Sequence, residues 1–292
     1  MVVESPSARE RRLARELRDL REAGPMHGKD VAVRLGWSAS KVSRIETGRI
    51  GITADDLDRL LELYAVPEAQ AGFLRRLAPS ARPKGWWDAY AETLSPGYAN
   101  LIRLEAGSRA LRCYGALVPH ALLQSPDFLR QVILSTWETP SQVEIDRRMQ
   151  VCRRRQDVLD AGSPDGPLGF HAVLDESVRR RTPVASGQDG GAAVLRGQLE
   201  WLAVASARPN VTLQVLPFAA GLPPVTAGSF SVLESRATGT PDVVYLENKT
   251  RVFYLDSAAE VQRYEQAFDL LSRMALDPAE SLELIRRTSG QL

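Results

Sequence analysis

Residues 28–48 read GKDVAVRLGWSASKVSRIETG, and this stretch decides how the first part of the chain folds. Its first half places Val31, Ala32 and Leu35 at the spacing of one helical face. Gly36 follows directly, and glycine is the residue that most often ends a helix. The pattern predicts a short amphipathic helix that stops at Gly36.

A second helix is predicted directly after this stop. Ser38 is a favoured N-cap residue, Val42 and Ile45 repeat the apolar helical spacing, and Gly48 is the next stop signal. Two short helices joined by a tight turn form a helix-turn-helix. The same geometry also occurs in ordinary helical bundles, so a purely structural role is the alternative to a binding role.

The predicted second helix carries Ser40, Lys41, Ser43 and Arg44 on its outer side. Hydroxyls and a guanidinium reach base edges and phosphates when a helix lies in the major groove of DNA. Three residues after Ser38 stands Lys41 rather than the Glu of a capping box, so the helix N-terminus stays positive and open to a phosphate. These features favour DNA binding.

The stretch GWSASKVSRIETGR, preceded by LRDLREAG and followed by TADDLDRLLELY, resembles the XRE family, the Cro/repressor type of helix-turn-helix. The resemblance implies an all-α domain of five helices over about residues 7 to 78. It implies base contacts for Ala39, Ser40 and Arg44 and a structural ion pair between Arg21 and Glu46. It implies phosphate contacts for Lys41, Ser43, Thr47 and Arg49.

Three positions depart from the family pattern at the start of the first helix. His27 stands where such domains have a Thr or Ser cap, Pro25 where they have Gly, and Gly28 where they often have Gln. Lys29 then replaces the missing Gln as a phosphate-binding candidate. The complete set of DNA-binding candidates is Lys29, Ser38, Ala39, Ser40, Lys41, Ser43, Arg44, Thr47 and Arg49.

Positive charge is concentrated at the N-terminal end of the chain. Residues 1–49 contain eleven Lys or Arg and seven Asp or Glu, a surplus of four, whereas the whole chain has a net charge of +1. Binding is therefore expected from one placed surface and not from general attraction to nucleic acid. Domains of this kind read two half-sites about 34 Å apart, which implies a homodimer on a roughly palindromic site in double-stranded DNA.

Length and composition give the chain material for two domains, with 292 residues of which 44% are hydrophobic. We find no run of about 18 apolar residues for a membrane span, and MVVESPSARERR lacks the apolar core of a signal peptide. We therefore expect a cytoplasmic protein. Cys113 and Cys152 lie on predicted helices and are expected to be buried thiols.

The segment PSARPKGWWDAY breaks the helical pattern and sets a domain boundary near residue 80. The first domain is then 1–80 and the second 81–292, with a mainly helical part over 81–161. Ser141 with Glu144 forms a capping box for one of its helices. The solvated side of that helix is predicted to carry Arg147, Arg148, Arg153, Arg154 and Arg155.

Strands are expected to alternate with helices over residues 162–292, which makes the second domain α+β. A helix is predicted over about 190 to 207, and Ser257 with Glu260 and Asp277 with Glu280 cap two more. A sheet of about five strands is predicted from short segments rich in Val, Phe and Tyr. The segments are LGFHAVL (168–174), VTLQVLPF (211–218), GSFSVLE (228–234), DVVYLE (242–247) and RVFYLD (251–256).

The second region also resembles a known group. GWWDAY, YANLIRLE, LVPHALLQSPDF, VLDESVRRR, ARPNVTLQVLPFAAG and VVYLEN, in this order, are similar to the domain of unknown function that follows XRE domains in regulators of mycelial, high-GC bacteria. The resemblance implies an antitoxin-like transcriptional regulator, commonly encoded beside a small partner protein. His120 stands where the group tends to have Gly, and Phe128 where it tends to have Tyr.

Catalysis by the second domain is weakly signalled, and we expect no enzyme, metal or cofactor. His27, His120 and His171 are isolated from one another and from any Cys pair, so neither a zinc site nor a His-based triad is indicated. A remote alternative is a metal-dependent nuclease using Asp242, Glu247 and Lys249. Their spacing is too tight for that site, because all three fall on one strand or its turn.

A ligand-sensing or partner-docking role for the second domain remains the nearer alternative. VLPFAAGLPPVTAGSF (215–230) is a long loop of apolar residues, prolines and glycines at the end of a strand, where a pocket or a protein-binding edge could form. Trp86, Trp87, Tyr90 and Tyr98 could line such a pocket, although aromatic residues just past a linker more often serve domain packing. The favoured interpretation is a homodimeric DNA-binding regulator.

Overall fold

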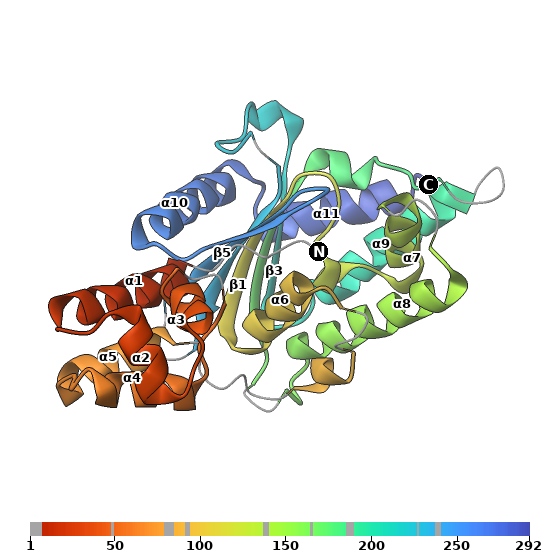
Figure 1. The fold of residues 1–292 in the computed structure, drawn as a ribbon. Coiled ribbons are helices and arrows are strands. Elements are labelled where there is room, and N and C mark those ends of the chain that lie inside the picture. Colours follow the sequence, from red (N-terminus) through yellow and green to blue (C-terminus); the bar gives the residue numbers. More distant parts are fainter. Residues whose placement is uncertain are drawn as a thin grey trace. The chain divides into compact units, whose positions relative to one another are not determined.

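The computed structural model describes residues 8–47, 50–78, 85–90, 94–136, 140–163, 166–184, 190–226, 228–236 and 241–292 (Figure 1). The chain divides into two compact units. The first is Met1–Gly97 with Leu255–Ser257, and the second is Tyr98–Tyr254 with Ala258–Leu292. The predicted domain boundary near residue 80 lies outside the described residues.

The first unit contains the predicted five-helix domain. Its helices are α1 (Ala8–Ala23), α2 (Gly28–Leu35), α3 (Ala39–Glu46), α4 (Ala54–Leu63) and α5 (Glu68–Leu77). All five lie within the expected residues 7 to 78, so this part of the fold prediction is confirmed. A 3₁₀ turn, η1 (Trp86–Tyr90), follows.

One apolar core joins the five helices. Val31, Ala32, Leu35, Val42 and Ile45 are all buried, as the sequence predicts, and fully burying an aliphatic side chain of Val, Leu or Ile size stabilises a fold by about 1.5–3 kcal/mol. The other helices contribute further buried side chains, among them Leu13, Leu17, Leu57, Leu60, Leu61 and Leu74. The inner faces of α2 and α3 are therefore fixed by this core.

The turn between α2 and α3 has the predicted signals. Gly36 has a φ of 69°, in the left-handed region that a side chain disfavours, and its N–H donates to the carbonyl of Val33. The N–H of Trp37 donates to the carbonyl of Ala32 at 2.8 Å, which closes the end of α2. Ser38 Oγ then accepts from the N–H of Lys41 at 3.1 Å and caps α3. Both predictions, the stop and the cap, are confirmed.

The second unit is built on one mixed sheet of six strands. They are β1 (Ser108–Gly115), β2 (Gly169–Asp175), β3 (Val211–Leu216), β4 (Phe230–Ser235), β5 (Val243–Glu247) and β6 (Val252–Leu255). The strand order is β3-β2-β1-β4-β5-β6. The first three strands are parallel to one another, and β4 is antiparallel to both β1 and β5.

All five predicted strands are present, and β1 is a sixth strand that the sequence does not predict. This strand lies near the middle of the sheet, inside the stretch over 81–161 that the sequence predicts as mainly helical. Its sequence, SRALRCYG, has no β-branched residue, so local propensity does not reveal it. The prediction that Cys113 lies on a helix is therefore wrong, since this residue is in β1, and its side chain is buried as expected.

Helices complete the second unit on both sides of the sheet (Figure 1). They are α6 (Pro96–Ala106), α7 (Pro126–Thr136), α8 (Gln142–Gln156), α9 (Gly190–Ala205), α10 (Ala258–Met274) and α11 (Pro278–Ser289), and short 3₁₀ turns are η2 (Ala121–Leu123), η3 (Asp157–Leu159), η4 (Glu176–Arg179) and η5 (Phe218–Ala220). The predicted capping boxes at Ser141 and Asp277 are both formed. None of the helices that the structure describes is long and apolar enough to span a bilayer.

Side chains that alternate along the strands serve two different layers. On one face, Leu111 and Cys113 of β1 belong to an apolar core that also takes in side chains of α6, α9 and α11. The opposite face is covered by α10, where His171 meets the ring of Phe268 at 4.9 Å between centroids. This second face also carries a charged pair, since Arg112 donates to Glu265 of α10 there at 2.7 Å. Figure 1 shows α10 on its own side of the sheet.

A buried ion pair joins α6 and α8 in the second unit. Arg155 is 2% exposed and Glu105 1% exposed, and two guanidinium nitrogens donate to the carboxylate at 2.9 and 2.6 Å. A third nitrogen donates to the hydroxyl of Tyr98 at 2.5 Å. Burial alone would lower the pKa of Arg155, but Glu105 raises it well above its ordinary value. The prediction that Arg155 lies on a solvated face with its neighbours is wrong.

Candidate nucleic-acid interface

The outer side of α3 is exposed and polar. Val42 and Ile45 are buried on its inner side, and no acidic residue lies in its first turn. The exposed side chains at and along the helix are Ser38, Ala39, Ser40, Ser43, Arg44 and Thr47. A helix of this kind presents hydroxyl donors and one guanidinium without a repelling carboxylate at its positive end.

Arg44 lies in the middle of this exposed side. Its Nε donates to the backbone carbonyl of Ser40 at 3.3 Å, and no other partner of Arg44 is present in the described part of the chain. Its terminal nitrogens are therefore available for a bidentate contact. Thr47 is placed differently, because its hydroxyl donates to the carbonyl of Ser43 at 2.7 Å.

Lys41, for which the resemblance implies a phosphate contact, makes contacts within the domain. Its Nζ lies 2.7 Å from Oδ2 of Asp56 on α4 and 4.0 Å from the centroid of the Trp37 ring. Gly48 and Arg49, the other ends of the predicted site, lie outside the described residues.

Asp30, which the sequence does not single out, caps the start of α2. The N–H of His27 donates to Oδ2 of Asp30 at 2.7 Å, so Asp30 supplies the half of a capping box that faces back along the chain. This contact compensates for the absence of Thr or Ser before α2. Lys29 is exposed directly beside it.

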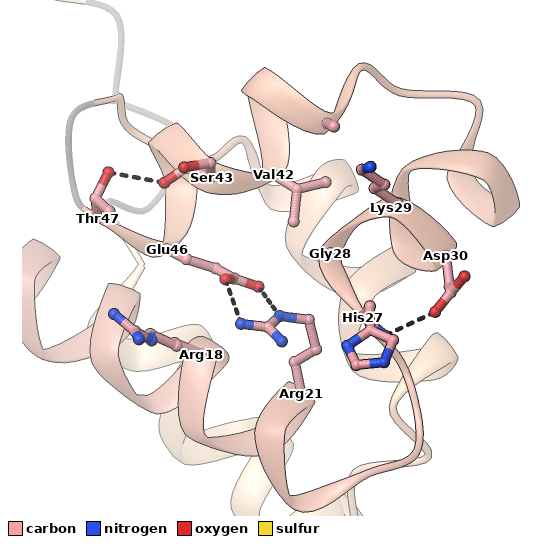
Figure 2. A pocket seen from close by; sticks show the side chains of 11 residues that line it. Arg18, Arg21, His27, Gly28, Lys29, Asp30, Val42, Ser43, Glu46 and Thr47 are labelled. Atoms are coloured by element: carbon pink, nitrogen blue, oxygen red, sulfur yellow. Dashed lines mark hydrogen bonds and ion pairs between the residues drawn. The ribbon is translucent and has the colours of Figure 1, made fainter.

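Residues of α1, the start of α2 and α3 line a hollow of about 660 Å³ (Figure 2). Lys29, Ser43 and Thr47 line it together, so the structure brings residues of two helices to one concave surface. Arg18 of α1 also lines it, and the sequence did not single out this residue. The remaining lining residues are Arg21, His27, Gly28, Asp30, Ala39, Val42 and Glu46.

Arg21 and Glu46 join α1 to the end of α3 at the floor of this region. Nε and one terminal nitrogen of Arg21 donate to the two carboxylate oxygens at 2.7 and 3.0 Å (Figure 2). The hydrogen bond to Glu46 raises the pKa of Arg21. Burial, and secondarily Glu46, raises the pKa of Tyr64 to about 12. The Arg21 and Glu46 side chains are only 13% and 9% exposed, so the pair fixes α3 and does not face outward.

The three residues of the remote nuclease alternative have separate partners. Asp242 accepts from the N–H of Ser235, Glu247 accepts from the hydroxyl of Tyr245, and Lys249 donates to the carbonyl of Thr136. These contacts do not bring the two carboxylates and the ammonium together. Among the described residues there is no group of three His, Cys, Asp or Glu that could hold a metal ion.

Both histidines of the second unit make their contacts within that unit. Burial lowers the pKa of His120 to about 3, and its Nδ1 accepts from the N–H of Leu122 at 3.3 Å. His171 shares a hydrogen bond of 2.7 Å with Gln214, and burial lowers its pKa as well. Both rings are therefore neutral packing residues at neutral pH.

The aromatic and loop candidates are distributed over the two units. Trp86 packs edge-on against Trp87 and Tyr90 in the first unit, each at 6.0 Å between centroids. In the loop after β3, Phe218 and Leu222 are exposed. The loop therefore presents apolar side chains to solvent.

Comparison with known proteins assigns both regions. Residues 12–74 match the model of a helix-turn-helix domain, and residues 98–287 match the model of a domain of unknown function, DUF5753. No curated protein and no solved structure matches the chain. The second match covers more than half of the sequence, and the chain therefore belongs to the DUF5753 family, with a helix-turn-helix domain ahead of the family domain.

Proposed function

We propose that this protein is a sequence-specific, DNA-binding transcriptional regulator of the XRE type. The observation that carries the proposal is α3, which is anchored by Val42 and Ile45 and turns an acid-free polar side to solvent. In the proposed complex this helix lies in the major groove. Ser40 and Arg44 read base edges there, and Ala39 contacts a thymine methyl group.

The phosphate contacts are proposed on both sides of this helix. Lys29 approaches one strand from the start of α2, and Ser43 and Arg49 approach from α3 and the residues after it. Thr47 joins them by turning its hydroxyl away from the carbonyl of Ser43. The capped N-terminus at Ser38 adds the positive end of the helix dipole. The 660 Å³ hollow supports this arrangement, since Lys29, Ser43 and Thr47 already line one surface.

The DUF5753 domain is proposed to provide dimerisation and to receive the regulatory signal. A homodimer places two copies of α3, the recognition helix, about one helical turn of DNA apart, which a single helix-turn-helix domain cannot do. The resemblance to antitoxin-like regulators supports a small partner protein as the signal, acting in the cytoplasm. A domain boundary near residue 80 would leave the head free to follow the DNA.

Two measurements on the full chain test this proposal. Purified protein is titrated into labelled duplexes drawn from a random pool, and enriched duplexes are then incubated with the protein in Mg²⁺ and analysed for length. We expect selective binding of two chains to one roughly palindromic site, with the DNA intact. Failure to enrich any sequence would contradict the proposal, and cutting that Asp242→Ala abolishes would establish the nuclease alternative instead.

Lys29→Gln is expected to weaken binding to selected and random duplexes alike. The lysine carries a phosphate contact and no base contact, so its loss removes one released counterion and flattens the slope of log K against log salt by about 0.9. The measurement is a titration at several salt concentrations. Arg34→Gln is the matched control, because Arg34 lies on the same helix and does not line the hollow. A loss confined to the selected sequence would count against a phosphate role.

A further inference from the structure

The recognition helix carries one lysine whose charge is already matched inside the domain. Nζ of Lys41 lies 2.7 Å from Oδ2 of Asp56, and the Lys41 and Asp56 side chains are 31% and 17% exposed. The same Nζ lies 4.0 Å from the centroid of the Trp37 ring. An ammonium held between a carboxylate and an aromatic face makes an ion pair and a cation–π contact at once.

Both partners of Lys41 are themselves fixed. Asp56 lies in the first turn of α4, where the helix dipole favours a carboxylate, and its N–H donates to Oγ1 of the N-cap Thr53 at 3.1 Å. Trp37 also has Arg59 beside it, 5.8 Å from the ring centroid, and Arg59 donates to the carbonyl of Leu35 at 2.8 Å. The group thus ties α3, α4 and the end of α2 together.

We infer that Lys41, Asp56 and Trp37 form a positioning clamp. The clamp fixes the orientation of α3 in the domain and keeps the lysine charge from binding DNA phosphates. The inference rests on the proposed function, because it concerns how the same interface discriminates between sequences. A free lysine on the recognition helix would strengthen binding to every sequence equally. With that charge matched by Asp56, discrimination depends on the base contacts of Ser40 and Arg44.

The alternative is that Lys41 leaves the clamp when DNA binds and takes a phosphate. That movement breaks the ion pair and the ring contact together and leaves Asp56 as an uncompensated negative charge near the DNA backbone. A single phosphate contact replaces only one of these losses. The clamped arrangement is therefore the one that persists in the complex, and the two arrangements predict different salt dependences.

Three variants of the full chain separate them. Lys41→Gln should leave the slope of log K against log salt unchanged, whereas a phosphate-bound lysine would lose about 0.9 of slope. Asp56→Asn frees the lysine, so we expect random duplex DNA to bind at least threefold tighter, with a slope steeper by about 0.9. The double variant should return to the wild-type slope. Thermal unfolding confirms that each variant is folded.

Asp55→Asn is the matched control, because it removes the same charge from the same turn of α4 without releasing Lys41. An equal rise in affinity for Asp55→Asn and Asp56→Asn would overturn the clamp, since the effect would then be general charge. A flatter slope for Lys41→Gln, or an unchanged slope for Asp56→Asn, would overturn it as well. Absence of DNA binding by the wild-type chain would refute the proposed function and is seen before any variant is made.

Discussion

Glu105→Gln is expected to lower the free energy of unfolding of the DUF5753 domain by about 3–5 kcal/mol, because it leaves Arg155 buried with an uncompensated charge. The guanidinium would keep the hydroxyl of Tyr98 as a partner but lose the carboxylate that it contacts at 2.9 and 2.6 Å. A loss of this size is a large fraction of the stability of an ordinary domain. Denaturant unfolding measures this loss as a lower midpoint at an unchanged m-value, which is the slope of the unfolding free energy against denaturant concentration.

The matched control for this prediction lies on the same part of the chain. Arg154, the residue before Arg155, pairs with Asp157 at 2.9 Å, but both side chains are more than half exposed. Exposed pairs of this kind contribute about 0–1 kcal/mol, so Asp157→Asn should change the unfolding midpoint little. Equal losses for Glu105→Gln and Asp157→Asn would show that burial of the Glu105–Arg155 pair does not matter.

Arg44→Ala is expected to abolish preference at one base pair of each half-site, with a loss of about 1–3 kcal/mol on the selected duplex and a much smaller loss on random DNA. The reason is geometric. The terminal nitrogens of Arg44 have no partner in the described part of the chain, and a guanidinium in the major groove pairs with the O6 and N7 atoms of guanine. The experiment repeats the selection from a random pool with wild-type and variant protein.

Arg34→Ala serves as the control, since Arg34 is also an exposed arginine of the head and does not lie on α3. The same consensus from wild-type and Arg44→Ala protein would contradict a base-reading role. A uniform loss across all sequences would instead assign Arg44 to a phosphate.

The helix-turn-helix domain is predictable from the sequence because the signals that bound its helices are local. Gly36 ends α2 and Ser38 caps α3 within a few residues of the helices that they bound, and Val42 and Ile45 follow the helical period. The partner of Lys41 was not predictable in this way. Asp56 lies on another helix, fifteen residues further along the chain, and only the packing of α3 on α4 brings the two charges together.

The second domain shows the same limit more strongly. The sequence predicts the five strands rich in Val, Phe and Tyr but not β1, which has no β-branched residue and whose apolar pattern is interrupted by Arg109 and Arg112. Those arginines are accommodated by Glu234 of the neighbouring strand, at 3.1 and 2.8 Å. Arg155 was misplaced for a similar reason, since its only acidic partner in the described contacts, Glu105, is fifty residues away.

Methylation protection of a selected duplex tests the central claim most directly, because dimethyl sulfate reacts with guanine N7 in the major groove. If α3 lies in that groove, bound protein should protect guanines in two patches whose centres are about 10 base pairs apart, and Arg44→Ala should restore reactivity at one guanine in each patch. Full guanine reactivity at saturating protein, on a duplex that the protein demonstrably binds, would contradict the placement of α3 in the major groove.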